Sequence, residues 1–154
     1  MAVTNHERVG KGLDLLKTGL QPFVNRELQA AYGEKWKDRV REILGSSQPR
    51  SSKKVNPSEM DIALLLKVMW DCWNDAFSKA LGYAERSLVS ELREVRNNWA
   101  HQQTFTTDDA YRALDSMHRL LTAVSAAKEA DELEKQKTEL LRLKFDEQAR
   151  HDKR

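Results

Sequence analysis

The stretch "DIALLLKVMWDCWNDAF" (residues 61–77) is the most apolar part of the chain and decides the fold class. Its apolar residues recur at intervals of three or four, which is the spacing of one face of an α-helix: Ile62, Leu66, Met69, Trp73 and Phe77. Leu65 and Trp70 widen that face, so the predicted helix is apolar over much of its circumference. A helix of this kind is expected near the centre of a helical bundle.

The segments on either side have the same helical periodicity, and none alternates in the manner of a β-strand. Only 6 glycines and 3 prolines interrupt the 154 residues. The pattern predicts helices over residues 5–33, 34–44, 58–81, 83–100, 106–127 and 128–154. The expected caps of three of these helices are Asn5, then Asn56 or Ser58, then Thr106 or Thr107. The sequence therefore predicts an all-α fold.

Other breaks and buried faces follow from the same pattern. Pro22 permits a kink or a new helix start, and "GSSQPRSSKKVNP" (45–57) is expected to be a mobile loop. Gly33 and Gly82 are expected to end helices. The expected buried stripe of the 83–100 helix is Leu88, Leu92, Val95 and Trp99, and that of the next helix is Ala110, Leu114, Met117, Leu121 and Val124.

Composition indicates a helix-rich domain, with 40% hydrophobic and 32% charged residues. No run of about 18 apolar residues is present, so no membrane span is expected. The N-terminus lacks the apolar core of a signal peptide. The one cysteine, Cys72, lies between two tryptophans in the most apolar segment, which favours burial over a reactive role. These features favour a cytoplasmic protein with no membrane partner.

Charge is distributed unevenly along the chain. Residues 1–56 carry 11 Lys/Arg against 6 Asp/Glu, residues 57–127 carry 7 against 10, and residues 128–154 carry 8 of each. The mildly basic first third permits contact with nucleic acid without requiring it. After Ala127 charges occur nearly everywhere. We therefore expect a domain over residues 1–127 and a charged helical extension or linker over 128–154 that projects partly beyond it.

The segment "REVRNNWAHQQ" (93–103) gathers the residues best suited to chemistry. Cleaving RNA without a metal requires a group that moves a proton to or from the reacting oxygens, which is a role that histidine side chains such as that of His101 commonly fill. It also requires a fixed positive charge on the phosphate, which Arg96 is able to supply. Asn97 is placed to orient Arg96, and Arg93 and Asn98 are further candidate RNA contacts.

On an ideal helix, however, Arg96 and His101 lie about 140° apart. They meet only if the helix unwinds around Ala100, or across a two-fold axis to which each chain contributes one of each. Across such an axis, Glu94 is a candidate partner of His101. A plainer interpretation is that arginine and histidine here only stabilise the C-terminal end of the helix dipole.

The motif "RNNWAH" (96–101) resembles the Arg-x4-6-His motif of the HEPN superfamily, whose arginine is typically followed by Asn, Asp or His. Residues 88–121 resemble the Swt-type branch of that superfamily, and residues 7–28 are similar to the way that branch begins. The resemblance spans roughly residues 6–127. It implies a bundle of four to five helices that dimerises through the motif helices. It also implies a metal-independent endoribonuclease that leaves a 2′,3′-cyclic phosphate.

Carried over to this chain, the resemblance implies that Arg96 binds phosphate, that His101 is the acid or base, and that Asn97 orients Arg96. It implies RNA as the substrate, a homodimer, and an N-terminal place in a larger bacterial protein with C-terminal ATPase or helicase domains linked to phage defence. Two alternatives stay open. One is a non-catalytic module of the same fold that dimerises or binds RNA or a partner; the other binds a nucleotide or small ligand beside residues 93–103.

The remaining candidates have weaker signals. Four histidines and one cysteine show no metal-ligand spacing, and no phosphate-binding loop motif occurs, so no metal or cofactor is expected. His118 is expected to be a partly buried or exposed polar residue. Three of the four tryptophans lie on apolar stripes and are expected in the core rather than stacked on bases. The basic segment 50–54 is a candidate phosphate contact, although a solvated loop is the plainer interpretation.

Overall fold

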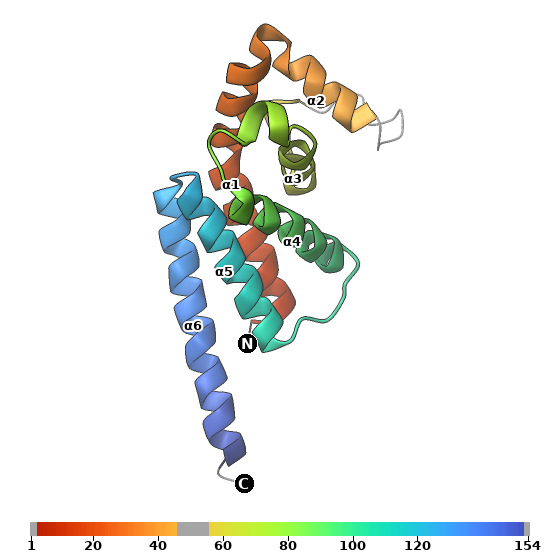
Figure 1. The fold of residues 1–154 in the computed structure, drawn as a ribbon. Coiled ribbons are helices and arrows are strands. Elements are labelled where there is room, and N and C mark those ends of the chain that lie inside the picture. The colour runs from red at the N-terminus through yellow and green to blue at the C-terminus, as the bar shows by residue number, and fades with distance from the viewer. Residues whose placement is uncertain (1–2, 46–55, 153–154) are drawn as a thin grey trace.

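The computed structural model describes residues 3–45 and 56–152, so the basic segment 50–54 and most of the expected loop lie outside the described residues. Within them the chain forms helices and no strands: α1 (Asn5–Tyr32), α2 (Trp36–Gly45), α3 (Ile62–Asp71), α4 (Tyr83–Ala100), α5 (Thr107–Ala123) and α6 (Ala127–Asp152). A 3-10 turn, η1 (Gly33–Lys35), precedes α2, and a π-helical turn, η3 (Trp73–Phe77), follows α3. The predicted all-α fold with a long C-terminal helix is confirmed (Figure 1).

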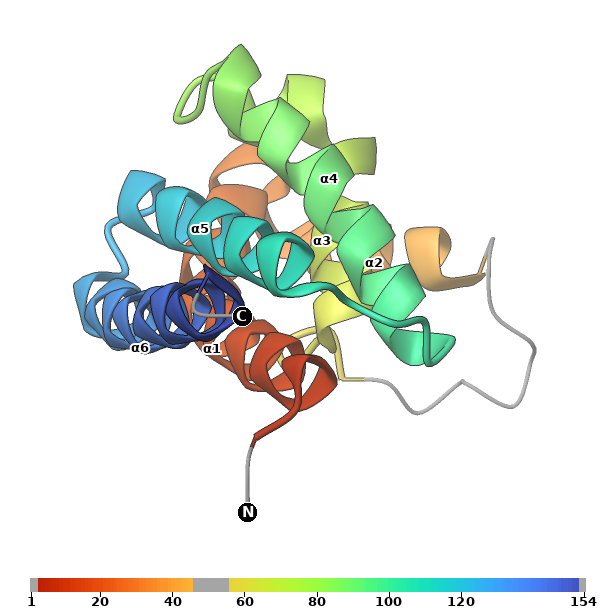
Figure 2. The ribbon, with the colours of Figure 1, turned by 90° about the horizontal axis from the view of Figure 1, so that it is seen from below.

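The longest helix, α1, runs through the middle of the bundle and contacts every other helix. α5 and α6 pack against one of its sides, and α3 with α4 packs against another (Figure 1, Figure 2). Its apolar stripe is at most 3% exposed: Val9, Leu13, Leu16 and Leu20. Pro22 lies inside α1, so no new helix begins there. α3 is largely buried, as predicted, but α1 is the helix that joins the bundle together.

Two glycines of α1 allow α5 to approach its backbone closely. A Cβ atom added to Gly12 would lie 2.7 Å from Leu114 Cδ2. One added to Gly19 would collide with Leu121 Cδ2 and lie 3.0 Å from Ala126 Cβ. Residues seven apart lie on nearly the same face of a helix, so the two glycines form one smooth strip that faces α5.

Gly19→Ala is expected to lower the free energy of unfolding by about 1–3 kcal/mol, because the added methyl group overpacks the α1–α5 contact. The better helix propensity of alanine returns up to about 1 kcal/mol of this loss. Urea unfolding measures the difference. Gly45→Ala is the matched control, since a Cβ atom there would have no neighbour within 4 Å. If the two variants were equally stable, close approach through Gly19 would not limit the packing.

The predicted cap of α5 is confirmed. Thr106 Oγ1 accepts a hydrogen bond from the Asp109 N–H at 3.0 Å, and the Asp109 carboxylate accepts one from the Thr106 N–H at 3.4 Å. This reciprocal pair satisfies two N–H groups that the first turn of the helix leaves free. The predicted buried stripe of α5 is also confirmed: Ala110, Leu114, Met117, Leu121 and Val124.

The predicted caps of two other helices are wrong. Thr4, not Asn5, caps α1, because the Asn5 side chain is used elsewhere and donates to the Phe105 carbonyl oxygen at 3.1 Å. Asp61 caps α3 by accepting from the Leu64 N–H at 2.8 Å. The predicted alternatives, Asn56 and Ser58, instead form a turn before α3, in which the Asn56 side chain accepts the Ser58 N–H at 3.0 Å.

The helix predicted over residues 58–81 is shorter and interrupted. α3 ends at Asp71, and in η3 the Ser78 N–H donates to the Trp73 carbonyl oxygen, five residues earlier, at 2.8 Å. The wider turn keeps both Trp73 and Phe77 in the core, at 4% and 0% exposure, with their ring centroids 6.4 Å apart. The predicted end of this helical segment at Gly82 is wrong, because η3 ends at Phe77 and a turn follows, and Gly82 instead precedes the first residue of α4.

The first half of α6 packs along α5 and α1, and its C-terminal end extends past the other helices (Figure 1). Its buried residues are Ala130, Leu133, Lys137 and Leu140, whereas Phe145 is 62% exposed. The division of the chain at residue 127 stays a prediction, because the start of α6 is packed on the bundle.

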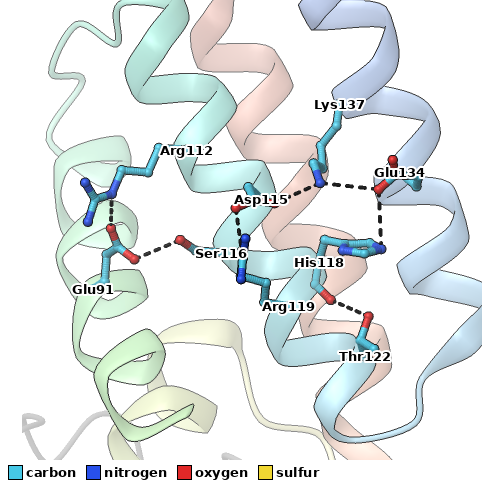
Figure 3. A network of polar contacts seen from close by, with 9 residues as sticks. All are labelled: Glu91, Arg112, Asp115, Ser116, His118, Arg119, Thr122, Glu134 and Lys137. Carbon is cyan, nitrogen blue, oxygen red and sulfur yellow. Dashed lines mark hydrogen bonds and ion pairs between the residues drawn. The ribbon is translucent and has the colours of Figure 1, made fainter. Parts of the chain in front are cut away.

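Polar contacts join α4, α5 and α6 across the bundle surface (Figure 3). The Lys137 ammonium of α6 lies 2.8 Å from Asp115 Oδ1 of α5 and 3.3 Å from Glu134 Oε2. Asp115 also accepts a hydrogen bond from Arg119 Nε at 2.8 Å. Lys137 is only 8% exposed, so its charge depends on these carboxylates.

The pKa of Asp115 is lowered: burial raises it, but hydrogen bonds from Lys137 and Arg119 outweigh burial. A carboxyl group of this kind stabilises the fold above its unfolded pKa of about 3.9, and that contribution is lost as the pH falls through the folded pKa. Asp115→Asn is therefore expected to lower the free energy of unfolding by about 1–2 kcal/mol at pH 7. Urea unfolding from pH 7 to pH 3 measures whether this difference shrinks in acid.

The control for this series is Asp131→Asn. Asp131 is exposed on α6, and no other described residue pairs with it, so its loss is expected to change stability little at any pH. A difference between wild type and Asp115→Asn that stays constant down to pH 3 would contradict the electrostatic origin of the effect.

Candidate functional site

The predicted site residues lie in the last two turns of α4, and this helix has the predicted bounds, 83–100. His101 follows as the C-terminal cap, and its N–H donates to the Asn97 carbonyl oxygen at 3.0 Å. Gln102 has a φ of 58°, a left-handed conformation that turns the chain out of the helix. The helix is therefore not unwound around Ala100, which removes one of the two routes by which Arg96 and His101 would meet.

The buried sector of α4 is wider than the predicted stripe. Val89 and Leu92 are fully buried, whereas the other three members of the stripe are only partly buried: Leu88, Val95 and Trp99. α4 packs against both α3 and α5, so its buried surface extends toward Val89, about 100° around the helix from Leu88. Arg96, about 80° around the helix from Leu88, falls within this wider sector and is partly buried.

Arg96 and His101 do not form a site within one chain. They lie about 140° apart around the helix axis, and His101 is exposed. No other described residue forms a hydrogen bond or ion pair with either side chain, and none joins Asn97 to Arg96. The expected orienting role of Asn97 therefore stays a prediction.

The C-terminal end of α4 is fixed to the N-terminal end of α1. The His6 and Trp99 rings are stacked, with centroids 5.1 Å apart and planes 9° from parallel. Trp99 Nε1 donates to the His6 carbonyl oxygen at 3.1 Å, and His6 Nε2 lies 3.0 Å from the Trp99 carbonyl oxygen. The sequence pattern missed this role of His6, since a contact 93 residues away leaves no local signal.

His6→Ala removes the stack and one hydrogen bond to the end of α4. The change is expected to lower the free energy of unfolding by about 1 kcal/mol and to speed amide hydrogen exchange at His101 to Gln103. Hydrogen exchange followed by mass spectrometry measures this local effect. His151→Ala, in the exposed end of α6, is the control. Unchanged exchange at His101 in His6→Ala would show that the stack does not hold this end of α4.

A groove of about 300 Å³ lies between α4 and α5, on the side of α4 that faces away from Arg96. Asn98 and Glu94 line it, together with the segment from Gln103 to Phe105. Arg112 Nε donates to Glu91 Oε1 at 2.5 Å within the groove. Of the predicted site residues, only Asn98 lies in this groove, so the structure separates it from Arg96. Arg93 is partly buried, on the other side of the helix.

The surroundings of several other candidate residues suit a structural role rather than a reactive or metal-binding one. Cys72 is 1% exposed, and burial raises the pKa of its thiol, which confirms the predicted buried role. The His118 imidazole is partly buried 3.5 Å from Glu134 Oε2. Among the described residues, no three His, Cys, Asp or Glu side chains are grouped so that they could hold a metal ion. None of the helices in this part of the chain is long and apolar enough to cross a membrane.

Comparison with known families finds one family whose model matches most of the chain. The family model described as Swt1-like HEPN matches residues 11–125. The chain belongs to this family. The matched segment contains the whole of α4, and with it the motif over residues 96–101. Neither the curated proteins nor the solved structures contain a match.

Proposed function

We propose that this Swt1-like HEPN domain is a metal-independent endoribonuclease whose site forms between two copies of the chain. The observation that supports the proposal is where Arg96 and His101 lie and that neither side chain has a partner among the described residues. Both lie at the end of one rigid helix, both lack a partner among the described residues, and they point to different sides. Two α4 ends related by a two-fold axis would bring Arg96 of one copy to His101 of the other.

The proposed reaction uses the side chains of Arg96 and His101 together with solvent water. The RNA 2′-hydroxyl attacks the adjacent phosphorus, and the bond from phosphorus to the 5′-oxygen breaks. His101 performs one of the two proton transfers: it takes the 2′-hydroxyl proton when neutral or donates a proton to the departing 5′-oxygen when protonated, and solvent water performs the other. Arg96 holds the phosphate oxygens and stabilises the charge that builds up on them. The products are a 2′,3′-cyclic phosphate and a 5′-hydroxyl, and DNA is not cut because it lacks the nucleophile.

The α4–α5 groove supports a nucleotide-binding alternative less well. Three carboxylates line it, those of Glu91, Glu94 and Asp109, against the single guanidinium of Arg112. A nucleotide phosphate there would meet mainly negative charge. A non-catalytic module that binds RNA or a partner remains the second proposal. C-terminal ATPase or helicase domains and a role in phage defence rest on the family resemblance alone.

The first test measures cleavage of labelled single-stranded RNA in EDTA, with a DNA copy as the control for the 2′-hydroxyl. Wild type is expected to cut only RNA. Arg96→Ala and His101→Ala are each expected to lose at least about 100-fold in rate, the lower range for a general acid–base group. His118→Ala, a histidine away from the motif, is expected to cut normally. Cutting of RNA by His101→Ala at the wild-type rate would refute the mechanism.

Mixing the two inactive variants tests the site between copies. A mixed dimer of Arg96→Ala and His101→Ala has one site with both residues intact and one site with neither. With random pairing, the mixture is expected to recover about a quarter of the wild-type activity. A site within one chain would recover none. Light scattering on the same samples measures whether the chain is a dimer.

A further inference from the structure

The charged residues of α4 are sorted onto two sides of the helix. The arginines fall within a sector of about 80°: Arg86, Arg93 and Arg96. The glutamates of the α4–α5 groove lie on the opposite side. All three arginines are partly buried, and none has an ion-pair partner in the part of the chain that the structure describes. α4 therefore presents a row of arginines without counter-charges.

Two carboxylates near Arg86, one at the start of α4 and one at the end of α3, have partners of their own. Glu85 accepts the Gly82 N–H at 3.3 Å at the start of α4. Asp71, at the end of the neighbouring α3, pairs with Lys67 at 3.0 Å. A charge that is partly withdrawn from water and has no partner is less well solvated than one in free solution. A row of three without partners therefore favours an external anion.

The row ends, at the start of α4, in a hollow of about 290 Å³. Its lining is aromatic, cationic and hydroxylic: Trp70, Tyr83, Arg86, Ser87 and Ser90. Tyr83 is 88% exposed, more than any other large hydrophobic side chain among the described residues. An aromatic ring so fully in water, beside a second partly exposed ring, is available for a ligand to stack on.

Arg86 is held in place although its buried Nε donates no hydrogen bond to any described residue. Its guanidinium carbon lies 4.5 Å from the Trp70 ring centroid and 5.9 Å from that of Trp73. Nε is buried and has no acceptor in the described part of the chain. Cation–π contacts of this kind fix the plane of a guanidinium while they leave its N–H groups unpaired. The group is thus oriented in advance for an acceptor that none of the described residues supplies.

We propose that this hollow is a second RNA-binding site, in which a base of single-stranded RNA stacks on Tyr83 and Trp70 and the adjoining phosphate binds Arg86. Aromatic rings beside arginine hold single strands largely without regard to sequence. Charge complementarity favours RNA, since Arg93 and Arg96 continue the cationic row from the hollow to the motif. The inference rests on the proposed function in one respect, because that row ends at the proposed cleavage site.

The geometry also sets the length of RNA that uses the site. Arg96 lies thirteen positions after Tyr83 in the sequence. This spacing corresponds to about 20 Å along the helix axis. A strand held at both ends must span that distance, so the second site is expected to strengthen binding of RNAs several nucleotides long.

The test uses the full chain and a fluorescent 2′-O-methyl oligouridylate of about 12 nucleotides, within the range of single-strand sites. This RNA has no free 2′-hydroxyl, so binding is measured without cleavage. Tyr83→Ala is expected to weaken binding about tenfold, the loss of one stacked base. Phe145→Ala is the matched control, since Phe145 is also exposed but lies on α6. Arg86→Gln is expected to flatten the salt dependence, lowering the slope by about 0.7 for one phosphate contact.

Each outcome either supports or overturns the proposed second RNA-binding site. Weaker binding by Tyr83→Ala with normal binding by Phe145→Ala supports the site, even if unmodified RNA is never cut, in which case only the proposed ribonuclease activity fails. Equal binding by Tyr83→Ala and wild type overturns the site, as does a wild type that does not bind the probe. Loss of the dimer in Tyr83→Ala, measured by light scattering, also overturns it, because the hollow would then hold a second copy of the chain.

Discussion

The structure depends on how closely α5 approaches the backbone of α1. Gly12 and Gly19 make that approach possible, because a side chain at either position would collide with α5 or the turn after it. α5 in turn provides the surface on which both α4 and α6 pack. If α5 moved outward, the Glu91 contacts with Arg112 and Ser116 and the Lys137 contact with Asp115 would be broken together. The absence of two side chains thus determines where the motif helix lies.

The end of α4 and the segment after it are held between the starts of α1 and α5. His6 and Trp99 join it to α1, Asn5 holds the following segment at Phe105, and Thr106 starts α5 directly afterwards. This end is therefore rigid, although it carries His101 on an exposed surface. Rigidity here has a chemical consequence. One chain cannot bring His101 round to Arg96 without breaking the last turn of the helix, so a second chain is the less costly way to complete the pair.

The sequence was sufficient for the fold class, the bounds of α4 and the cap of α5, because these depend on periodicity and on local hydrogen bonds. It was not sufficient for the caps of α1 and α3. Asn5 and Asn56 are good caps by residue type, but Asn5 is taken by a contact with Phe105 and Asn56 by a turn. The anchoring role of His6 and the unpaired state of Arg86 both depend on distant residues, so no local pattern reveals them. Arg96, Asn97 and His101 were found through a motif, and their chemistry remains a prediction.

The charged residues of α4 are divided between its two sides, with glutamates on one side and arginines on the other. On the side that faces α5, Glu91 accepts hydrogen bonds from Arg112 and Ser116, and these contacts join α4 to α5. On the other side, its arginines have no ion-pair partner among the described residues. Salt-dependent RNA binding is the expected consequence of the proposed site, because each arginine that binds a phosphate releases counterions from the RNA. The helix that carries the motif is thus also suited to guide a strand toward it.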